Sequence, residues 1–211
     1  MTGAEIYRKL LHLSLIWVVL VYYCFGFYIT EKVLLILLIF MICFEFSRLK
    51  SEGMGRFASV VINKMKLASI IRENEKNSLT SASQLLIAAY IAIYLLPEIF
   101  YLPAFSIAII SDSVAAFIGR KYGHTHVLNK TLEGSLGFLL SATLISFFWW
   151  FALNENYNYL LLALIAAAAT TLVELCSKKL VLDDNMLIFI TYSIVIFTIS
   201  SILLSPKVAP W

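Results

Sequence analysis

The sequence predicts an all-α polytopic membrane protein, and three observations lead to this prediction. Hydrophobic residues make up 61% of the 211 residues and charged residues only 14%, whereas soluble domains contain roughly 45–50% and 25%. Apolar runs long enough to cross a bilayer recur along the chain. Most Lys and Arg residues lie between alternate runs. So few charges exclude a soluble domain or a nucleic-acid-binding protein, and the three Cys residues lack metal-ligand spacing.

The apolar runs predict about seven transmembrane helices. They cover approximately residues 10–28, 32–46, 79–97, 102–119, 135–153, 158–176 and 186–205. Residues 47–78 are polar and basic, and they predict an amphipathic interfacial helix near 54–72, with a plain cytosolic loop as the alternative. No Pro/Gly-rich linker interrupts the chain, so residues 1–211 are expected to form a single membrane domain.

The basic residues predict the orientation. With the N-terminus in the cytoplasm, every one of the 16 Lys and Arg residues except Lys32 and Lys207 falls on the inner side. This asymmetry follows the positive-inside rule. We therefore expect an integral membrane protein, in the cytoplasmic membrane if the host is a prokaryote.

Asp112 is the first candidate for chemistry, because an ionisable residue inside a span is costly and commonly functional. It precedes Arg120 by eight residues, or about 12 Å of helix. Ala115, Ala116 and Gly119 share its face, which leaves room for a neighbouring helix or for a bound phosphate with its metal. The alternative is a structural Asp that hydrogen-bonds a neighbouring span.

The segment after this span, residues 119–137, is basic and glycine-rich. Thr131 or a neighbour is expected to cap the next helix, with Glu133 in its first turn. A helix N-terminus bracketed by cations can bind phosphate, and the carboxylates of Asp112 and Glu133 nearby would suit Mg²⁺. The alternative is a positive-inside loop with helix-packing glycines. The cations and small residues concerned are Arg120, Lys121, Lys130, Gly134, Ser135 and Gly137.

Further polar residues gather at the same predicted inner side. They are Glu5, Arg8, Lys9 and His12 on one face of the first helix, Glu45 and Arg48 at the inner end of the second span, Glu174 near the end of the sixth, and Asp183, Asp184 and Asn185 before the seventh. The predicted outer loops offer only ordinary caps and turns. A functional site would therefore face the cytosol.

These motifs resemble the polyprenol kinase family, which includes dolichol kinase, phytol and farnesol kinases and a CTP-dependent diacylglycerol kinase. The resemblance rests mainly on Asp112-x-x-Ala115-Ala116-x-x-Gly119-Arg120-x-x-Gly123 followed by Lys130-Thr131-x-Glu133-Gly134-Ser135. Glu5-x-x-Arg8-Lys9-x-x-His12, Leu79-Thr80-Ser81-Ala82-Ser83, and Glu174 with Asp183-Asp184-Asn185 are similar to further family motifs, in order. The chain departs from the family pattern at Ser81, His124 and His126, and in lacking a Pro after Asn185.

The resemblance implies a membrane lipid-alcohol kinase. It would transfer the γ-phosphoryl group of a nucleoside triphosphate, CTP in the eukaryotic members, with Mg²⁺, to a polyprenol, a phytol-like alcohol or diacylglycerol in the bilayer. Asp112, Glu133, Glu174 and Asp184 would be catalytic, and Asp112, Glu133 and Asp183 would hold the metal. The nucleotide would be bound by Gly119, Arg120, Lys121, Gly123, Lys130, Thr131, Gly134, Ser135, Arg8, Lys9 and His12.

Two other functions remain open at this point. A CTP:lipid-phosphate cytidylyltransferase would use the same groups to attack the α-phosphorus, and residue spacing does not separate it from the kinase. A small ion-coupled transporter would use Asp112 as its ion site. The scarcity of polar residues in the outer halves of the spans argues against such a through-pathway.

Overall fold

The structure is a computed structural model that describes residues 3–50, 79–128, 130–176 and 183–203. It divides into two compact units, Met1–Tyr90 and Ile91–Trp211, and each unit is described by itself. The predicted interfacial helix near 54–72 lies outside the described residues. The expectation of one domain over residues 1–211 stays a prediction.

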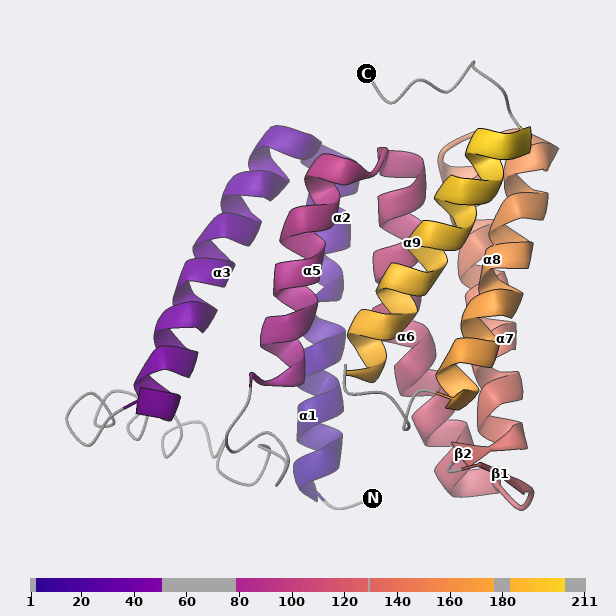
Figure 1. Cartoon of the computed structure of the whole chain (residues 1–211), viewed down its shortest axis with the longest axis horizontal. Coiled ribbons are helices and arrows are strands. Elements are labelled where there is room, and N and C mark those ends of the chain that lie inside the picture. The colour runs from indigo at the N-terminus through magenta and orange to yellow at the C-terminus, as the bar shows by residue number, and fades with distance from the viewer. Residues whose placement is uncertain (1–2, 51–78, 129, 177–182, 204–211) are drawn as a thin grey trace. The chain divides into compact units, whose positions relative to one another are not determined.

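The first unit contains α1 (Gly3–Ser14), α2 (Ile16–Phe25), α3 (Phe27–Lys50) and most of α5 (Ser81–Leu95) (Figure 1). Helices α2 and α3 pack against each other. Gly26 separates them with a φ of 72°, a left-handed conformation that glycine adopts without steric cost. Its N–H donates to the carbonyl of Tyr22 at 2.8 Å, which closes the end of α2.

The second unit is a bundle of four helices with a short hairpin at one end (Figure 1). Its elements are α6 (Glu98–Tyr122), β1 (His126–Val127), β2 (Lys130–Thr131), α7 (Leu132–Ala152), α8 (Tyr157–Cys176) and α9 (Asp184–Leu203). Helix α6 packs against α7 and α9, and α8 completes the ring between them. The antiparallel strands pair His126 with Thr131 and Val127 with Lys130. This hairpin is an addition to the predicted all-α fold.

Two hydrogen bonds between side chains and neighbouring helices satisfy polar groups within the bundle. Pro103 lies inside α6 and has no N–H for the carbonyl of Ile99 one turn earlier. The hydroxyl of Tyr159, on α8, donates to that carbonyl at 2.7 Å. Similarly, the indole N–H of Trp149 donates to Ser106 at 3.0 Å. Such pairing is required where no water reaches the backbone.

The core of the bundle is aromatic. Tyr101 and Phe105 on α6 and Phe189 on α9 are fully or almost fully buried, and their ring centroids lie 5.7–6.0 Å apart. These spacings suit offset or edge-to-face contact. The same packing of α6 against α9 brings Asp112 of α6 and Asn185 of α9 together.

Within the described residues, six helical segments are long and apolar enough to cross a membrane: Arg8–Phe25, Phe27–Leu49, Glu98–Tyr122, Leu132–Ala152, Tyr157–Cys176 and Asp184–Ile202. They correspond to six of the seven predicted spans. The third predicted span, 79–97, corresponds to α5, whose 15 residues extend about 22 Å. Large apolar side chains on the outside of α7 are exposed, including Leu136, Leu140, Leu144, Phe148 and Phe151. The chain is therefore an all-α integral membrane protein.

Candidate functional site

Lys130 is at the centre of a polar cluster at one end of the second unit. Its ammonium nitrogen lies 2.6 Å from Glu174 Oε1 and 3.2 Å from Asp184 Oδ2. Ser135 donates to the other oxygen of Glu174 at 3.2 Å. Glu174 and Ser135 are buried, and the Lys130 side chain is only 13% exposed. Side chains from β2, α7, α8 and α9 therefore meet at one point.

Asp112 on α6 is linked to the same cluster by a hydrogen bond from a residue of α9. With its amide oriented so that nitrogen faces acceptors, Asn185 donates to Asp112 Oδ2 and to the carbonyl of Ala108, both at 3.1 Å. Asp112 is 8% exposed. It thus makes the bond to a neighbouring span that the structural alternative predicts, and its charge also acts on Lys130.

The first turn of α9 supplies two side chains of the cluster, those of Asp184 and Asn185. The carboxylate of Asp183 accepts from the N–H of Asn185 at 3.0 Å, and its carbonyl accepts from Leu187 at 3.0 Å. This cap uses Asp183 to start the helix. Asp184 and Asn185 follow directly, and they reach Lys130 and Asp112 respectively.

The cluster contains more acidic than basic side chains. Burial by itself would lower the pKa of Lys130, but the carboxylates of Glu174, Asp184 and Asp112 raise the pKa above its ordinary value. Lys130 therefore stays protonated at neutral pH. Three carboxylates around one ammonium leave the cluster an excess of negative charge when all of them are ionised.

Helix packing positions Lys130. Thr131 caps α7 by accepting from the N–H of Gly134 at 3.3 Å, so the predicted cap is confirmed. A Cβ on Gly119 would lie 2.6 Å from Thr131 Oγ1, and a Cβ on Gly134 would lie 3.2 Å from Gly119 Cα. Helices α6 and α7 thus approach too closely here for any larger residue.

The other glycines of this segment also lie at close helix contacts. The space beside Gly123 is filled by the Thr131 side chain, and the space beside Gly137 by Ile118. The structure shows the helix-packing arrangement that was the alternative for this segment. The assignment of Gly119, Gly123 and Gly134 to nucleotide binding stays a prediction.

Other predicted site residues make contacts of their own or belong to the first unit. Glu133 accepts from the N–H of Thr125 at 3.0 Å and so holds the hairpin. Arg120 and Lys121 are exposed, and the Lys121 ammonium lies 5.7 Å from the Phe117 ring centroid and 5.1 Å from that of Tyr122. The predicted nucleotide ligands Arg8, Lys9 and His12 belong to α1 of the first unit, where His12 is buried.

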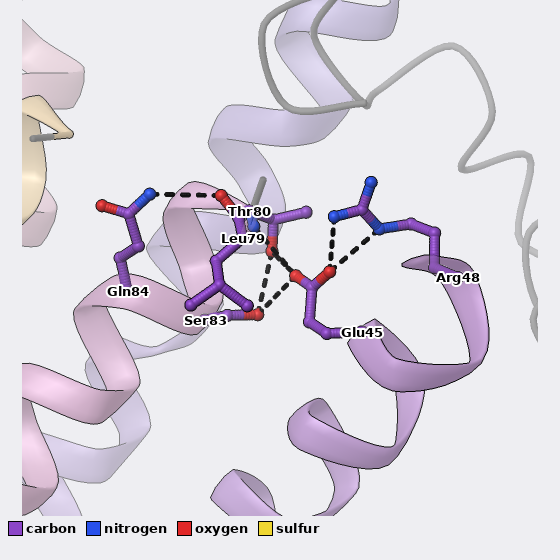
Figure 2. Close-up of polar contacts among 6 residues, drawn as sticks. All are labelled: Glu45, Arg48, Leu79, Thr80, Ser83 and Gln84. Atoms are coloured by element: carbon purple, nitrogen blue, oxygen red, sulfur yellow. Dashed lines mark hydrogen bonds and ion pairs between the residues drawn. The ribbon is translucent and has the colours of Figure 1, made fainter. Parts of the chain in front are cut away.

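The first unit has a carboxylate site of its own (Figure 2). Glu45 on α3 is 2% exposed, and its Oε1 accepts from Thr80 N at 2.9 Å, Thr80 Oγ1 at 2.6 Å and Ser83 Oγ at 2.7 Å. Its Oε2 accepts from Arg48 Nε at 2.9 Å. The carboxylate thus joins α3 to the start of α5, within the Leu79–Ser83 motif.

The cluster around Lys130 offers ligands that suit Mg²⁺. Among the described residues, no three His, Cys, Asp or Glu side chains are arranged to hold a metal by themselves. Mg²⁺ is commonly bound by one or two carboxylates together with water and substrate phosphate rather than by an all-protein cage. Asp112, Glu174 and Asp184 supply hard oxygen ligands and surplus negative charge, so the donor chemistry fits.

The sequence placed five members of the cluster among its candidates: Asp112, Lys130, Ser135, Glu174 and Asp184. Asn185 was noted only as part of a motif, and its bond to Asp112 was not foreseen. The signal for it is its place next to the candidates Asp183 and Asp184, in the first turn of the predicted helix. The contact between Glu45 and Thr80 was also missed, since nothing in either motif indicates the other.

Comparison with known proteins adds one similarity. No protein-family model matches the chain, and no solved structure matches it. The chain is similar to an uncharacterized protein of Rickettsia prowazekii (strain Madrid E), with 28% identity over 193 residues that cover 88% of this chain and 89% of that protein. The similarity therefore runs along most of both chains.

Proposed function

We propose that the protein is a membrane lipid-alcohol kinase. It transfers the γ-phosphoryl group of a nucleoside triphosphate, with CTP as the expected donor, to a polyprenol, a phytol-like alcohol or diacylglycerol. The observation that carries the proposal is the convergence of Lys130, Glu174, Asp184 and Asp112 at one end of four apolar helices. The resemblance to polyprenol kinases supplies the reaction class.

The proposed chemistry needs positioning and charge more than covalent catalysis. The lipid hydroxyl attacks the γ-phosphorus, the bond to the β-phosphate oxygen breaks, and the hydroxyl proton passes to Glu174. Lys130 binds the phosphoryl oxygens, and Ser135 orients Glu174 through its hydrogen bond. Asn185 orients Asp112. Asp112, Glu174 and Asp184 would hold Mg²⁺, which would neutralise charge on the triphosphate.

The proposed topology puts this site at the cytosolic boundary of the membrane. The N-terminus is cytoplasmic, and α5 crosses as a seventh span that is short for a hydrocarbon core of about 30 Å. Support comes from the asymmetry of Lys and Arg. An alcohol acceptor in the inner leaflet would then have its hydroxyl near the level at which α8 ends and α9 begins.

The testing experiment is a label-transfer assay. Purified full-length protein in mixed lipid micelles with Mg²⁺ receives α-labelled or γ-labelled CTP, with ATP in parallel, and a panel of polyprenols, phytol, diacylglycerol and phosphatidate. We expect label from the γ position in one lipid alcohol. Label from the α position would establish a cytidylyltransferase, and no transfer from either position would overturn both assignments.

Asp112→Asn tests the residue assignment within this assay. The Asn oxygen can still accept from Asn185, so insertion and folding should be retained. We expect a loss of rate of about a hundredfold or more, the usual effect of removing one preorganised electrostatic group. Glu155→Gln, in the turn between α7 and α8 at the other end of the bundle, is the matched control and should keep its rate. Near-normal activity of Asp112→Asn would remove Asp112 from the mechanism.

A further inference from the structure

Two lysines near the hairpin face different surroundings. Lys130 is directed into the carboxylate cluster. Lys121, one residue before the end of α6, is exposed and has its ammonium over the rings of Phe117 and Tyr122. Phe117 is 53% exposed and Tyr122 is 52% exposed. Lys121 thus forms part of an outer surface rather than of the cluster.

This surface lies at the edge of the apolar spans. One span ends at Tyr122 and the next begins at Leu132, so the intervening residues are at the level of the lipid headgroups. Aromatic and basic residues are enriched at that level, because a ring can rest on the acyl boundary while the charged group reaches phosphate. Lys121 with its two rings has this composition.

Leu128 adds an apolar group beyond the ends of the spans. It follows β1 with a φ of 58°, a conformation that is uncommon for a residue with a Cβ, and its side chain is 52% exposed. An apolar side chain displayed in this way on a connecting hairpin is unfavourable in water but favourable in a bilayer interface. The hairpin pairs Val127 with Lys130, so its anchoring would also hold Lys130 in place.

We propose that Phe117, Lys121, Tyr122 and Leu128 form a surface that binds anionic phospholipids at the membrane boundary. The ammonium of Lys121 binds the headgroup phosphate, the two rings contact the glycerol and upper acyl region, and Leu128 inserts among the acyl chains. The exposed cation and the adjoining apolar side chains complement an anionic lipid better than a freely soluble phosphate. The inference does not rest on the kinase proposal.

Spin labelling tests the insertion of Leu128. The full-length chain, with Cys24, Cys43 and Cys176 replaced by Ala, is placed in nanodiscs that contain phosphatidylglycerol and labelled at Leu128→Cys or at the control His124→Cys. We expect the label at 128 to be more accessible to oxygen than to a water-soluble nickel relaxant, and the label at 124 to show the reverse. Equal access of the nickel relaxant to both labels would overturn the insertion.

Lipid selectivity tests Lys121. The association of spin-labelled phosphatidylglycerol and phosphatidylcholine is compared for the wild type, Lys121→Gln and Lys121→Arg. We expect the preference for phosphatidylglycerol to fall at least twofold in Lys121→Gln and to be kept in Lys121→Arg. An unchanged preference in Lys121→Gln would overturn the proposal. Loss of the wild-type preference on adding inorganic phosphate or CTP would assign Lys121 to a soluble phosphate and overturn it as well.

Discussion

The ammonium of Lys130 neutralises carboxylates that come from two different helices. Glu174 lies near the end of α8 and Asp184 at the start of α9, and both lie within 3.2 Å of Lys130 Nζ. Replacing the cation by an apolar group would leave these carboxylates facing each other with little water. Breaking a buried ion pair in this way costs much more than the pair itself contributes, because one charge remains uncompensated.

We therefore expect Lys130→Met to lower the unfolding free energy by about 3–5 kcal/mol. Thermal unfolding of the purified protein in detergent measures the change. Lys121→Met, which removes an exposed lysine from the same connecting region, is the control and should change stability by less than about 1 kcal/mol. Combining Lys130→Met with Glu174→Gln should recover part of the loss, and no recovery would contradict the pairing.

The pH dependence of this contribution follows from the direction of the pKa shift. The carboxylates raise the pKa of Lys130 in the folded protein above its ordinary value of 10.5, which is the value expected in the unfolded chain. Protonated Lys130 therefore stabilises the fold fully below pH 10.5, and this contribution is lost as the pH rises through the folded pKa. The stability difference between the wild type and Lys130→Met should thus persist to about pH 10 and shrink above it. A difference that vanishes by pH 8 would contradict this account.

At the scale of the elements, α6 depends on a neighbouring helix for one of its backbone groups. Pro103 deprives Ile99 of its helical donor, and Tyr159 on α8 supplies a replacement at 2.7 Å. This part-buried bond joins the first turn of α6 to the first turn of α8. An unsatisfied buried carbonyl is costly, so the hydroxyl contributes more than an ordinary surface hydrogen bond.

Tyr159→Phe should consequently lower the unfolding free energy by about 1–3 kcal/mol. Pro103→Ala provides a sharper test, because an Ala at 103 restores an N–H for Ile99. In the Pro103→Ala background, the effect of Tyr159→Phe should be much smaller, and a double-mutant cycle in detergent measures the difference. The exposed Tyr157, replaced by Phe, is the control. Equal effects of Tyr159→Phe in both backgrounds would show that the hydroxyl does not serve the Ile99 carbonyl.

A comparison of the predicted spans with the observed helices and strands shows which parts of the fold can be predicted from the sequence. Hydropathy located six spans that the structure shows as long apolar helices, because hydropathy is a property of single segments. It also predicted a span over 79–97, where the structure has the 15-residue α5. The predicted spans left out residues at helix ends such as Glu98, Tyr122 and Asp184, which the structure includes in helices. The hairpin was missed because its four paired residues carry no alternating apolar pattern.

Residues of the candidate site could be predicted from the sequence where they share one helix face or one motif. Asp112, Lys130, Glu174 and Asp184 were each identified, but spacing within a helix does not determine which helices meet. Glu133 follows the cap of α7 and turns to the hairpin instead. The resemblance assigns Gly119, Gly123 and Gly134 to nucleotide binding, and a close helix approach requires the same absence of a Cβ.

At the scale of the whole molecule, the position of the charged cluster along the helices of the second unit indicates which end of the bundle holds the candidate site. In the second unit the cluster lies where α6 and α8 end and where α7 and α9 begin. The opposite end, at the turn between α7 and α8, contains caps such as the Asn156 side chain, which accepts from the N–H of Tyr159 at 2.9 Å. This asymmetry is what a site served by one aqueous compartment would require.

The orientation of α7 can be tested directly. Its 21 residues extend about 31 Å, which matches the hydrocarbon core, so His124 and Glu155 should lie on opposite sides of the membrane. Single Cys variants at these positions, with Cys24, Cys43 and Cys176 replaced by Ala, are treated in intact cells with a membrane-impermeant maleimide. We expect Glu155→Cys to react at once and His124→Cys to react only after permeabilisation, because Lys and Arg gather on the His124 side. The reverse pattern would invert the proposed topology and put the Lys130 cluster out of reach of cytosolic nucleotides. Labelling of both positions from outside would show that α7 does not cross the membrane.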